Sequence, residues 1–126
     1  SCLDSLNNSL DGIANEIIII DNNSKDGSCA FLKKNFPTVI LIESKINYGF
    51  GEGNNEAVKI AKADNILLLN NDTIVLDNLR PVLDYLKNDA KIGLIGINML
   101  DAKKEYLPVA GNFPNFNNMF QMKKLL

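Results

Sequence analysis

Short apolar runs alternate with segments of helical periodicity along most of this chain. Four runs have the length and the aliphatic composition of strands, and they lie at residues 16–20, 38–43, 65–69 and 92–97. The first of them suits a strand that is buried on both faces. Apolar residues at helical spacing lie around these runs, and the predicted helices cover residues 1–10, 26–35, 54–63 and 77–87. From Leu100 onward we expect an irregular tail, followed by a short helix near Met119.

This order of elements predicts an α/β fold with a mostly parallel sheet. Strands that alternate with helices at this spacing form right-handed βαβ units, and the helices cover both faces of the sheet. Ligands of such sheets bind at the carboxyl ends of the strands. Polar loops follow three of the predicted strands, and we expect them to bring Asp21, Asn47 and Asp72 into one shared cleft.

The composition narrows the chemistry that this chain can perform. The net charge of −2 gives no general attraction to nucleic acid. Histidine is absent, which removes the commonest general base and imidazole metal ligands. The two cysteines, Cys2 and Cys29, have no close spacing, which argues against a zinc site or a disulfide framework. An anionic ligand must then be held by backbone N–H groups, helix N-termini or a bound cation.

No transmembrane segment is predicted, because no apolar run approaches the roughly 20 residues that span a bilayer. The 126 residues fit one domain or part of one. Helical periodicity is already present at Leu3 and Leu6, and we therefore expect the sequence to begin inside an element.

Each polar loop has a structural interpretation and a functional one. The residues from Asp21 to Ser24 suit an Asx turn before a helix, which is favoured for this loop alone, although an Asp or Asn there can also bind a base edge or a ribose hydroxyl. The loop from Asn47 to Asn55 contains three alternating glycines, which suit either a tight turn or a phosphate contact. A dinucleotide fingerprint would need its third glycine at the position of Asn54.

The third loop, "NNDT" at residues 70–73, suits a turn or a metal site equally well. One carboxylate, Asp72, cannot hold a magnesium or manganese ion alone. Together with diphosphate oxygens and water, it can complete six oxygen ligands.

Taken together, the three loops resemble the donor half of a family 2 glycosyltransferase, closest to its rhamnosyltransferase-like branch. The segment "EIIIIDNNSKDGS" resembles the family's strand and loop with Asp-Asn, and "NYGFGEGNNEA" resembles its Asn-x-Gly-Phe segment. The segment "ILLLNNDT" resembles the Leu-Leu-Asn-Pro-Asp-Thr version of the DxD metal motif. Their order and spacing match over residues 1 to about 100, and "GNFPNF" matches more weakly.

The resemblance implies a glycosyltransferase A-type fold and a role for each loop. Asp21 or Asn22 would contact the nucleotide base, beside Ser24. Asn47, Gly49 and Asn55 would shape the loop around ribose and diphosphate.

The resemblance also implies a divalent metal, Mg or Mn. Asp72 would coordinate this metal, and Asn70 takes the position of the first Asp of the DxD motif. Because the Asn70 amide is neutral where that motif has a carboxylate, it should weaken the affinity for the metal. Two further departures, Ala57 and Ala63 in place of the family's glycines, look tolerable in helix packing.

The implied reaction is inverting transfer of a sugar from a dTDP- or UDP-linked donor to a glycan or lipid-linked acceptor. Its implied setting is bacterial cell-surface polysaccharide assembly, in the cytoplasm at the inner face of the membrane. The family's first strand and its acceptor half, which carries the general base, are expected outside residues 1–126. We therefore expect this chain to be the nucleotide-sugar-binding part of one domain, incomplete at both ends and inactive alone.

Two alternatives remain open at this point. One is a nucleotide-binding α/β domain of another kind, either dehydrogenase-like or nucleotidyltransferase-like. The glycine spacing tells against a dehydrogenase, and the N-terminus lacks the basic glycine-rich loop of a nucleotidyltransferase. The other alternative is a non-catalytic remnant that keeps the fold.

Overall fold

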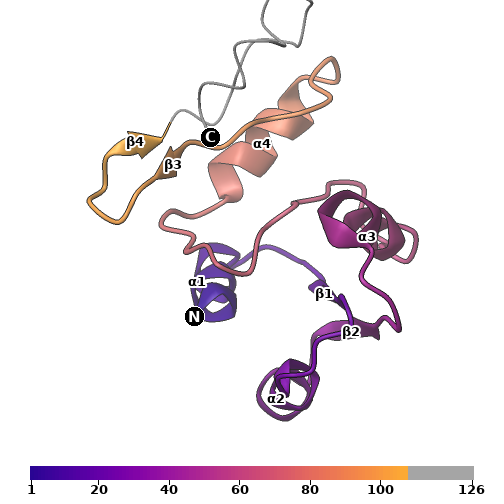
Figure 1. Ribbon diagram of the computed structural model, residues 1–126. Coiled ribbons are helices and arrows are strands. Elements are labelled where there is room, and N and C mark those ends of the chain that lie inside the picture. Colours follow the sequence, from indigo (N-terminus) through magenta and orange to yellow (C-terminus); the bar gives the residue numbers. More distant parts are fainter. Residues whose placement is uncertain (108–126) are drawn as a thin grey trace, which may run out of the picture. The chain divides into compact units, whose positions relative to one another are not determined.

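The computed structural model describes residues 1–107, which belong to two compact units divided after Tyr85 (Figure 1). The first unit contains α1 (Cys2–Ser9), β1 (Ile18–Asp21), α2 (Ser28–Asn35), β2 (Ile40–Glu43) and α3 (Gly49–Val58). Helix α4 (Arg80–Asn88) begins in the first unit and ends in the second. The second unit also contains the strands β3 (Met99–Leu100) and β4 (Tyr106–Leu107).

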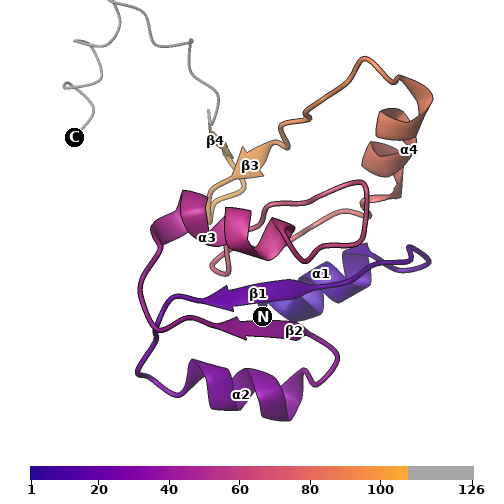
Figure 2. The ribbon, with the colours of Figure 1, turned by 90° about the vertical axis from the view of Figure 1, so that its right-hand side faces the viewer.

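The first unit is built on a parallel strand pair. Ile18 of β1 lies opposite Ile40 of β2, and Asp21 lies opposite Glu43. Helix α3 packs against β1 and α2 packs against β2, and Figure 2 shows the two helices on opposite sides of the pair. The predicted α/β arrangement, with helices on both faces of parallel strands, is confirmed.

Helix α1 begins with a capping box, which explains why the predicted N-terminal helix forms. The Ser1 hydroxyl accepts a hydrogen bond from the Asp4 backbone N–H at 3.3 Å, and the Asp4 carboxylate bonds back to Ser1. This exchange satisfies N–H groups that have no partner within the first turn of a helix. Leu6 is buried and anchors the helix.

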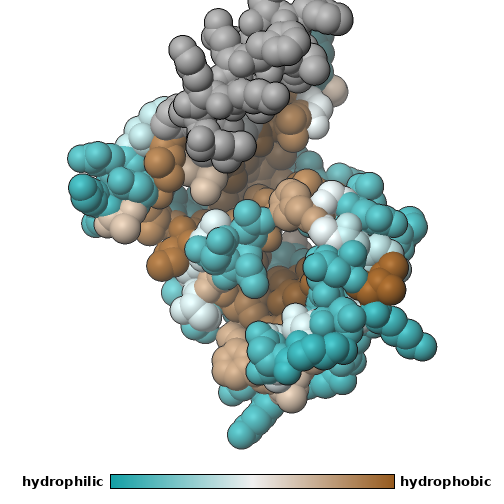
Figure 3. All heavy atoms as spheres, viewed as in Figure 1, coloured by the Kyte–Doolittle hydropathy of each residue, from teal (hydrophilic) through white to brown (hydrophobic). Residues whose placement is uncertain are grey.

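Two of the four predicted strands are wrong. Residues 65–69 and 92–97 have no strand pairing in the described part of the chain. Ile66, Leu67 and Leu68 are 46%, 42% and 55% exposed, and apolar side chains are open to solvent on the face drawn in Figure 3. A strand requires a neighbour for its backbone N–H and C=O groups, and an apolar run does not specify that neighbour.

The glycine-rich segment is also different from its prediction. Residues 49–53 were expected to form a loop before a helix at 54–63, but α3 begins at Gly49 and ends at Val58. Gly49 has φ +70° at the start of the helix, a left-handed conformation that suits glycine.

The second unit contains a short antiparallel hairpin where an irregular tail was predicted. Met99 pairs with Leu107 and Leu100 pairs with Tyr106. The Asp101 carboxylate closes the turn, because it accepts hydrogen bonds from the backbone N–H groups of Lys103 at 2.8 Å and Glu105 at 2.9 Å. The expected helix near Met119 and the "GNFPNF" segment lie outside the described residues.

None of the helices in the described part of the chain is long and apolar enough to cross a membrane.

Candidate functional site

Asp21 ends β1 and forms the predicted Asx turn. Its side chain is buried, and its Oδ2 atom accepts a hydrogen bond from the Ser24 backbone N–H at 3.0 Å. Hydrogen bonding from Ser24 lowers the pKa of the Asp21 carboxyl below its ordinary value, and this effect outweighs burial, which acts in the opposite direction. Asp21 is therefore a carboxylate at neutral pH, held in place at the carboxyl end of the strand.

Cys29 on α2 is a neighbour of this carboxylate. Burial, followed by the nearby carboxylates of Asp21 and Glu43, raises the pKa of the Cys29 thiol to about 11. The thiolate is the nucleophilic form of cysteine, so Cys29 is a thiol at neutral pH and is unsuited to act as a nucleophile.

Asn22 joins the loop after β1 to the beginning of α3. Its Nδ2 atom donates to the Gly49 carbonyl oxygen at 3.2 Å, and its Oδ1 atom accepts from the Tyr48 backbone N–H at 3.3 Å. Asn47 supports the same turn, because its Oδ1 atom accepts from the Gly49 N–H at 2.8 Å. Five of the predicted site residues therefore gather at the carboxyl ends of β1 and β2: Asp21, Asn22, Ser24, Asn47 and Gly49.

Gly53 is a residue of this site that the sequence reasoning did not single out. It is buried, and a Cβ atom built there would lie 3.4 Å from Ile20 Cγ2 and 3.6 Å from each polar side-chain atom of Asn22. A Cβ atom there would be in ordinary van der Waals contact with these atoms, so α3 lies close to β1 at this position. The signal in the sequence was the series of three alternating glycines, which did not indicate which of them met the strand.

Asn55 lies on α3 and is exposed. Its neighbour Asn54 donates from Nδ2 to the Phe50 carbonyl oxygen at 2.9 Å, and this bond stays within the helix.

The turn from Asn70 to Thr73 forms as predicted, although no strand precedes it. The Asn70 carbonyl oxygen accepts hydrogen bonds from Thr73 Oγ1 at 2.7 Å and from the Thr73 N–H at 3.4 Å. The hydrogen bonds of this segment to other elements go to α1, where Cys2 Sγ donates to the Asn70 carbonyl oxygen at 3.5 Å. Asn70 and Asp72 are exposed. The expected convergence of Asp72 with Asp21 in one cleft stays a prediction.

Within residues 1–107, no group of three or more His, Cys, Asp and Glu side chains is placed to hold a metal. The donors at the turn are the exposed carboxylate of Asp72 and the amides of Asn70 and Asn71. These oxygen donors fit Mg²⁺, which usually takes one or two carboxylates and fills its other positions with water and substrate phosphates. The turn thus suits a metal that is shared with a diphosphate.

Comparison with known proteins decides the family. The model of "Glycosyl transferase family 2" matches residues 1–124. The chain belongs to glycosyl transferase family 2. This membership confirms the family that the three loops resemble and the glycosyltransferase A-type α/β fold. It also removes the dehydrogenase-like and nucleotidyltransferase-like alternatives.

One relative is the poly(ribitol-phosphate) beta-glucosyltransferase of Bacillus spizizenii. It is 39% identical to this chain in an alignment of 79 residues, and the match covers 59% of the chain but only 12% of the relative. No solved structure matches the chain. Members of family 2 transfer sugars from nucleotide-sugar donors and generally depend on a divalent metal.

Proposed function

We propose that residues 1–126 form the nucleotide-sugar-binding part of one glycosyltransferase domain. The reaction is an inverting, metal-assisted transfer of a sugar from a nucleoside-diphosphate sugar to a glycan or lipid-linked acceptor. The observation that carries the proposal is the gathering of Asp21, Asn22, Asn47 and Gly49 at the carboxyl ends of β1 and β2 in a family 2 chain. Parallel sheets bind their ligands at this edge.

We assign different roles to the two residues at the end of β1. The Asp21 carboxylate contacts the nucleotide base or its ribose, since it is ionised and fixed by Ser24. Asn22 uses its amide to hold the start of α3, so it shapes the site around ribose and diphosphate together with Asn47, Gly49 and Asn55.

The metal belongs at the turn from Asn70 to Thr73. The Asp72 carboxylate binds it, and the Asn70 amide oxygen is a neutral second ligand. When bound, a divalent ion stabilises the negative charge of the departing nucleoside diphosphate. The turn supplies an exposed carboxylate and amide oxygens, while the net charge of the chain offers a diphosphate little other neutralisation.

The sugar and the acceptor are proposed at a coarser level. The loop motifs resemble the rhamnosyltransferase-like branch, which favours a rhamnosyl donor linked to dTDP or UDP. The glucosyltransferase relative makes a glucosyl donor and a poly(ribitol-phosphate) acceptor the second candidate. We place the reaction in cell-surface polysaccharide assembly, in the cytoplasm at the inner face of the membrane.

Calorimetry on the full-length protein tests the metal role of Asp72. We expect UDP or dTDP to bind in the presence of manganese and to bind much more weakly without it. Asp72→Ala should abolish the gain that manganese gives, because the remaining amides are poor metal ligands without a carboxylate. The matched control is Asp77→Ala, which removes the same charge from an exposed position further along the segment.

Equal manganese-dependent binding by wild type and Asp72→Ala would contradict this proposal. A loss of equal size in Asp77→Ala would indicate a general effect of charge and would also count against it.

A further inference from the structure

The turn that carries Asp72 is held by α1, the helix at the other end of the first unit's sequence. We propose that α1 sets the position of this turn and that Ser5 is a positioning residue for the Asp72 carboxylate. The proposal rests on the metal role of Asp72 proposed above, and it adds a residue that none of the loop motifs contains.

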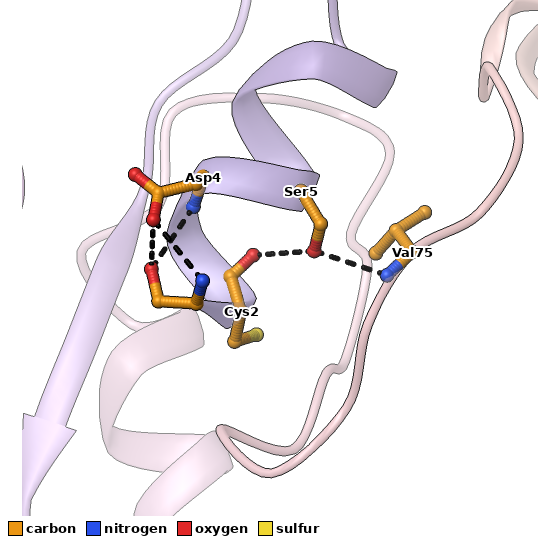
Figure 4. Close-up of polar contacts among 5 residues, drawn as sticks. Cys2, Asp4, Ser5 and Val75 are labelled. Carbon is orange, nitrogen blue, oxygen red and sulfur yellow. Dashed lines mark hydrogen bonds and ion pairs between the residues drawn. The ribbon is translucent and has the colours of Figure 1, made fainter. Parts of the chain in front are cut away.

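Residues 70–80 follow one face of α1. Contacts to this segment come from Cys2, Ser5 and Ser9, whose spacing places them on one side of α1, and from Gly12, which lies three residues past the end of the helix. Two of these contacts use side chains. Cys2 Sγ donates to the Asn70 carbonyl oxygen at 3.5 Å. Ser5 Oγ accepts from the Val75 N–H at 3.1 Å (Figure 4).

The other two contacts use backbone carbonyl groups, one at the last residue of α1 and one in the turn that follows it. The Ser9 carbonyl oxygen accepts from the Leu79 N–H at 3.0 Å, and the Gly12 carbonyl oxygen accepts from the Arg80 guanidinium. The segment is therefore attached to α1 and to the turn after it at several points rather than at one.

The polar character of this face explains how it fixes the turn. Apolar contacts are non-directional, whereas a hydrogen bond requires a short distance and a defined angle. Ser5 Oγ works in both directions, because it donates to the Cys2 carbonyl oxygen at 2.8 Å and accepts from Val75 (Figure 4). Its own rotation is thereby fixed, which defines where the Val75 N–H lies.

Asp72 lies inside the stretch that these contacts hold. Asn70 contacts Cys2 on one side of it, and Val75 contacts Ser5 on the other. Thr73 Oγ1 is 3.9 Å from Cys2 Sγ. Mg²⁺ demands near-ideal octahedral geometry at about 2.0–2.1 Å, so a carboxylate ligand on a displaced turn binds it poorly.

The test compares three variants of the full-length protein by calorimetry with UDP or dTDP, with and without manganese. Ser5→Ala removes the acceptor for Val75, and we expect manganese-dependent affinity to fall by roughly three- to tenfold, the loss expected for one hydrogen bond. Binding without manganese should be unchanged. Ser5→Thr keeps a hydroxyl at this position and should restore most of the affinity.

Ser1→Ala is the matched control. It removes the capping box and so weakens α1 itself, while in the described part of the chain Ser1 bonds only to Asp4 and Ser5. We expect no loss of manganese-dependent affinity at a temperature where all variants are folded. Hydrogen exchange of the Val75 amide provides a second readout, and it should accelerate in Ser5→Ala and remain slow in Ser5→Thr.

Wild-type manganese dependence in Ser5→Ala, despite faster exchange at Val75, would overturn the positioning role and leave the role of Asp72 intact. An equal loss in Ser1→Ala would overturn it as well, since general weakening of α1 would then explain both. If Asp72→Ala itself keeps manganese-dependent binding, the proposed function fails first and the positioning role fails with it.

Discussion

The residue types at the end of β1 do not by themselves determine which groups these side chains bond to. An Asn after a strand suits a turn, a base contact or a helix cap equally well. Here both polar atoms of the Asn22 amide bond to the backbone at Tyr48 and Gly49, across 26 and 27 residues of sequence. Asp21 was predicted as an Asx-turn residue and forms that turn, because its partner Ser24 is close in the sequence. Local partners were thus predictable from the sequence, and distant ones were not.

The raised pKa of the Cys29 thiol, which lies beside Asp21, can be tested by alkylation. Its thiol should react with iodoacetamide very slowly near pH 8, because its pKa of about 11 leaves few molecules as thiolate. The rate should rise until the pH passes that value, well above the ordinary 9.0. Asp21→Asn removes a neighbouring anion that disfavours the thiolate, so the midpoint should move down, although burial, the larger cause, should keep it above 9.0.

Peptide mass spectrometry after alkylation at a series of pH values separates Cys29 from Cys2 without altering either residue. A midpoint for Cys29 near 9.0 in the wild type would contradict the burial and the carboxylate contacts described for this thiol.

At the scale of elements, α1, α2 and the strands β1 and β2 were predicted from the sequence within a few residues of their observed bounds. The helix α3 was predicted five residues too late, since three glycines disfavour a helix by intrinsic propensity. Packing of α3 against β1 overrides that preference. The predicted strands at 65–69 and 92–97 do not form, for a different reason. An apolar run does not specify which neighbouring strand would pair with its backbone.

The glycines of α3 give a matched pair of substitutions. Gly51→Ala places its Cβ in open space, so it should stabilise the protein by about 0.5–1 kcal/mol through helix propensity. Gly53→Ala gains the same propensity and places its Cβ 3.4 Å from Ile20 Cγ2 and 3.6 Å from the Asn22 amide, which are ordinary van der Waals distances, so it should stabilise the protein at least as much. Urea unfolding of both variants beside the wild type measures the difference. Destabilisation by Gly53→Ala would show that α3 lies closer to β1 than described.

At the scale of the whole molecule, the division of labour between donor and acceptor sites can be tested directly. We expect the 126-residue chain alone to transfer no sugar to an acceptor. The chain has no histidine, and our proposal assigns Asp21 to the donor and Asp72 to the metal. A general base within hydrogen-bond reach of the acceptor contributes about a hundredfold to ten-thousandfold, and loss of acceptor positioning costs more.

The measurement incubates the purified chain with labelled nucleotide sugars and a membrane extract, beside a longer version of the protein that extends past residue 126. Slow hydrolysis of the donor to free sugar is compatible with our proposal. Acceptor labelling by the short chain at a rate comparable to the longer version would place the base within residues 1–126.

The attachment of residues 70–80 to α1 also bears on the order in which the first unit folds. The Cys2–Asn70 and Ser5–Val75 bonds join residues 68 and 70 positions apart, whereas the parallel strands β1 and β2 pair residues about 22 apart. Closing a longer loop costs more chain entropy, and contacts of high sequence separation form slowly. The strand pair with α2 can therefore assemble first, and the turn that carries Asp72 is completed only when residues 70–80 meet α1.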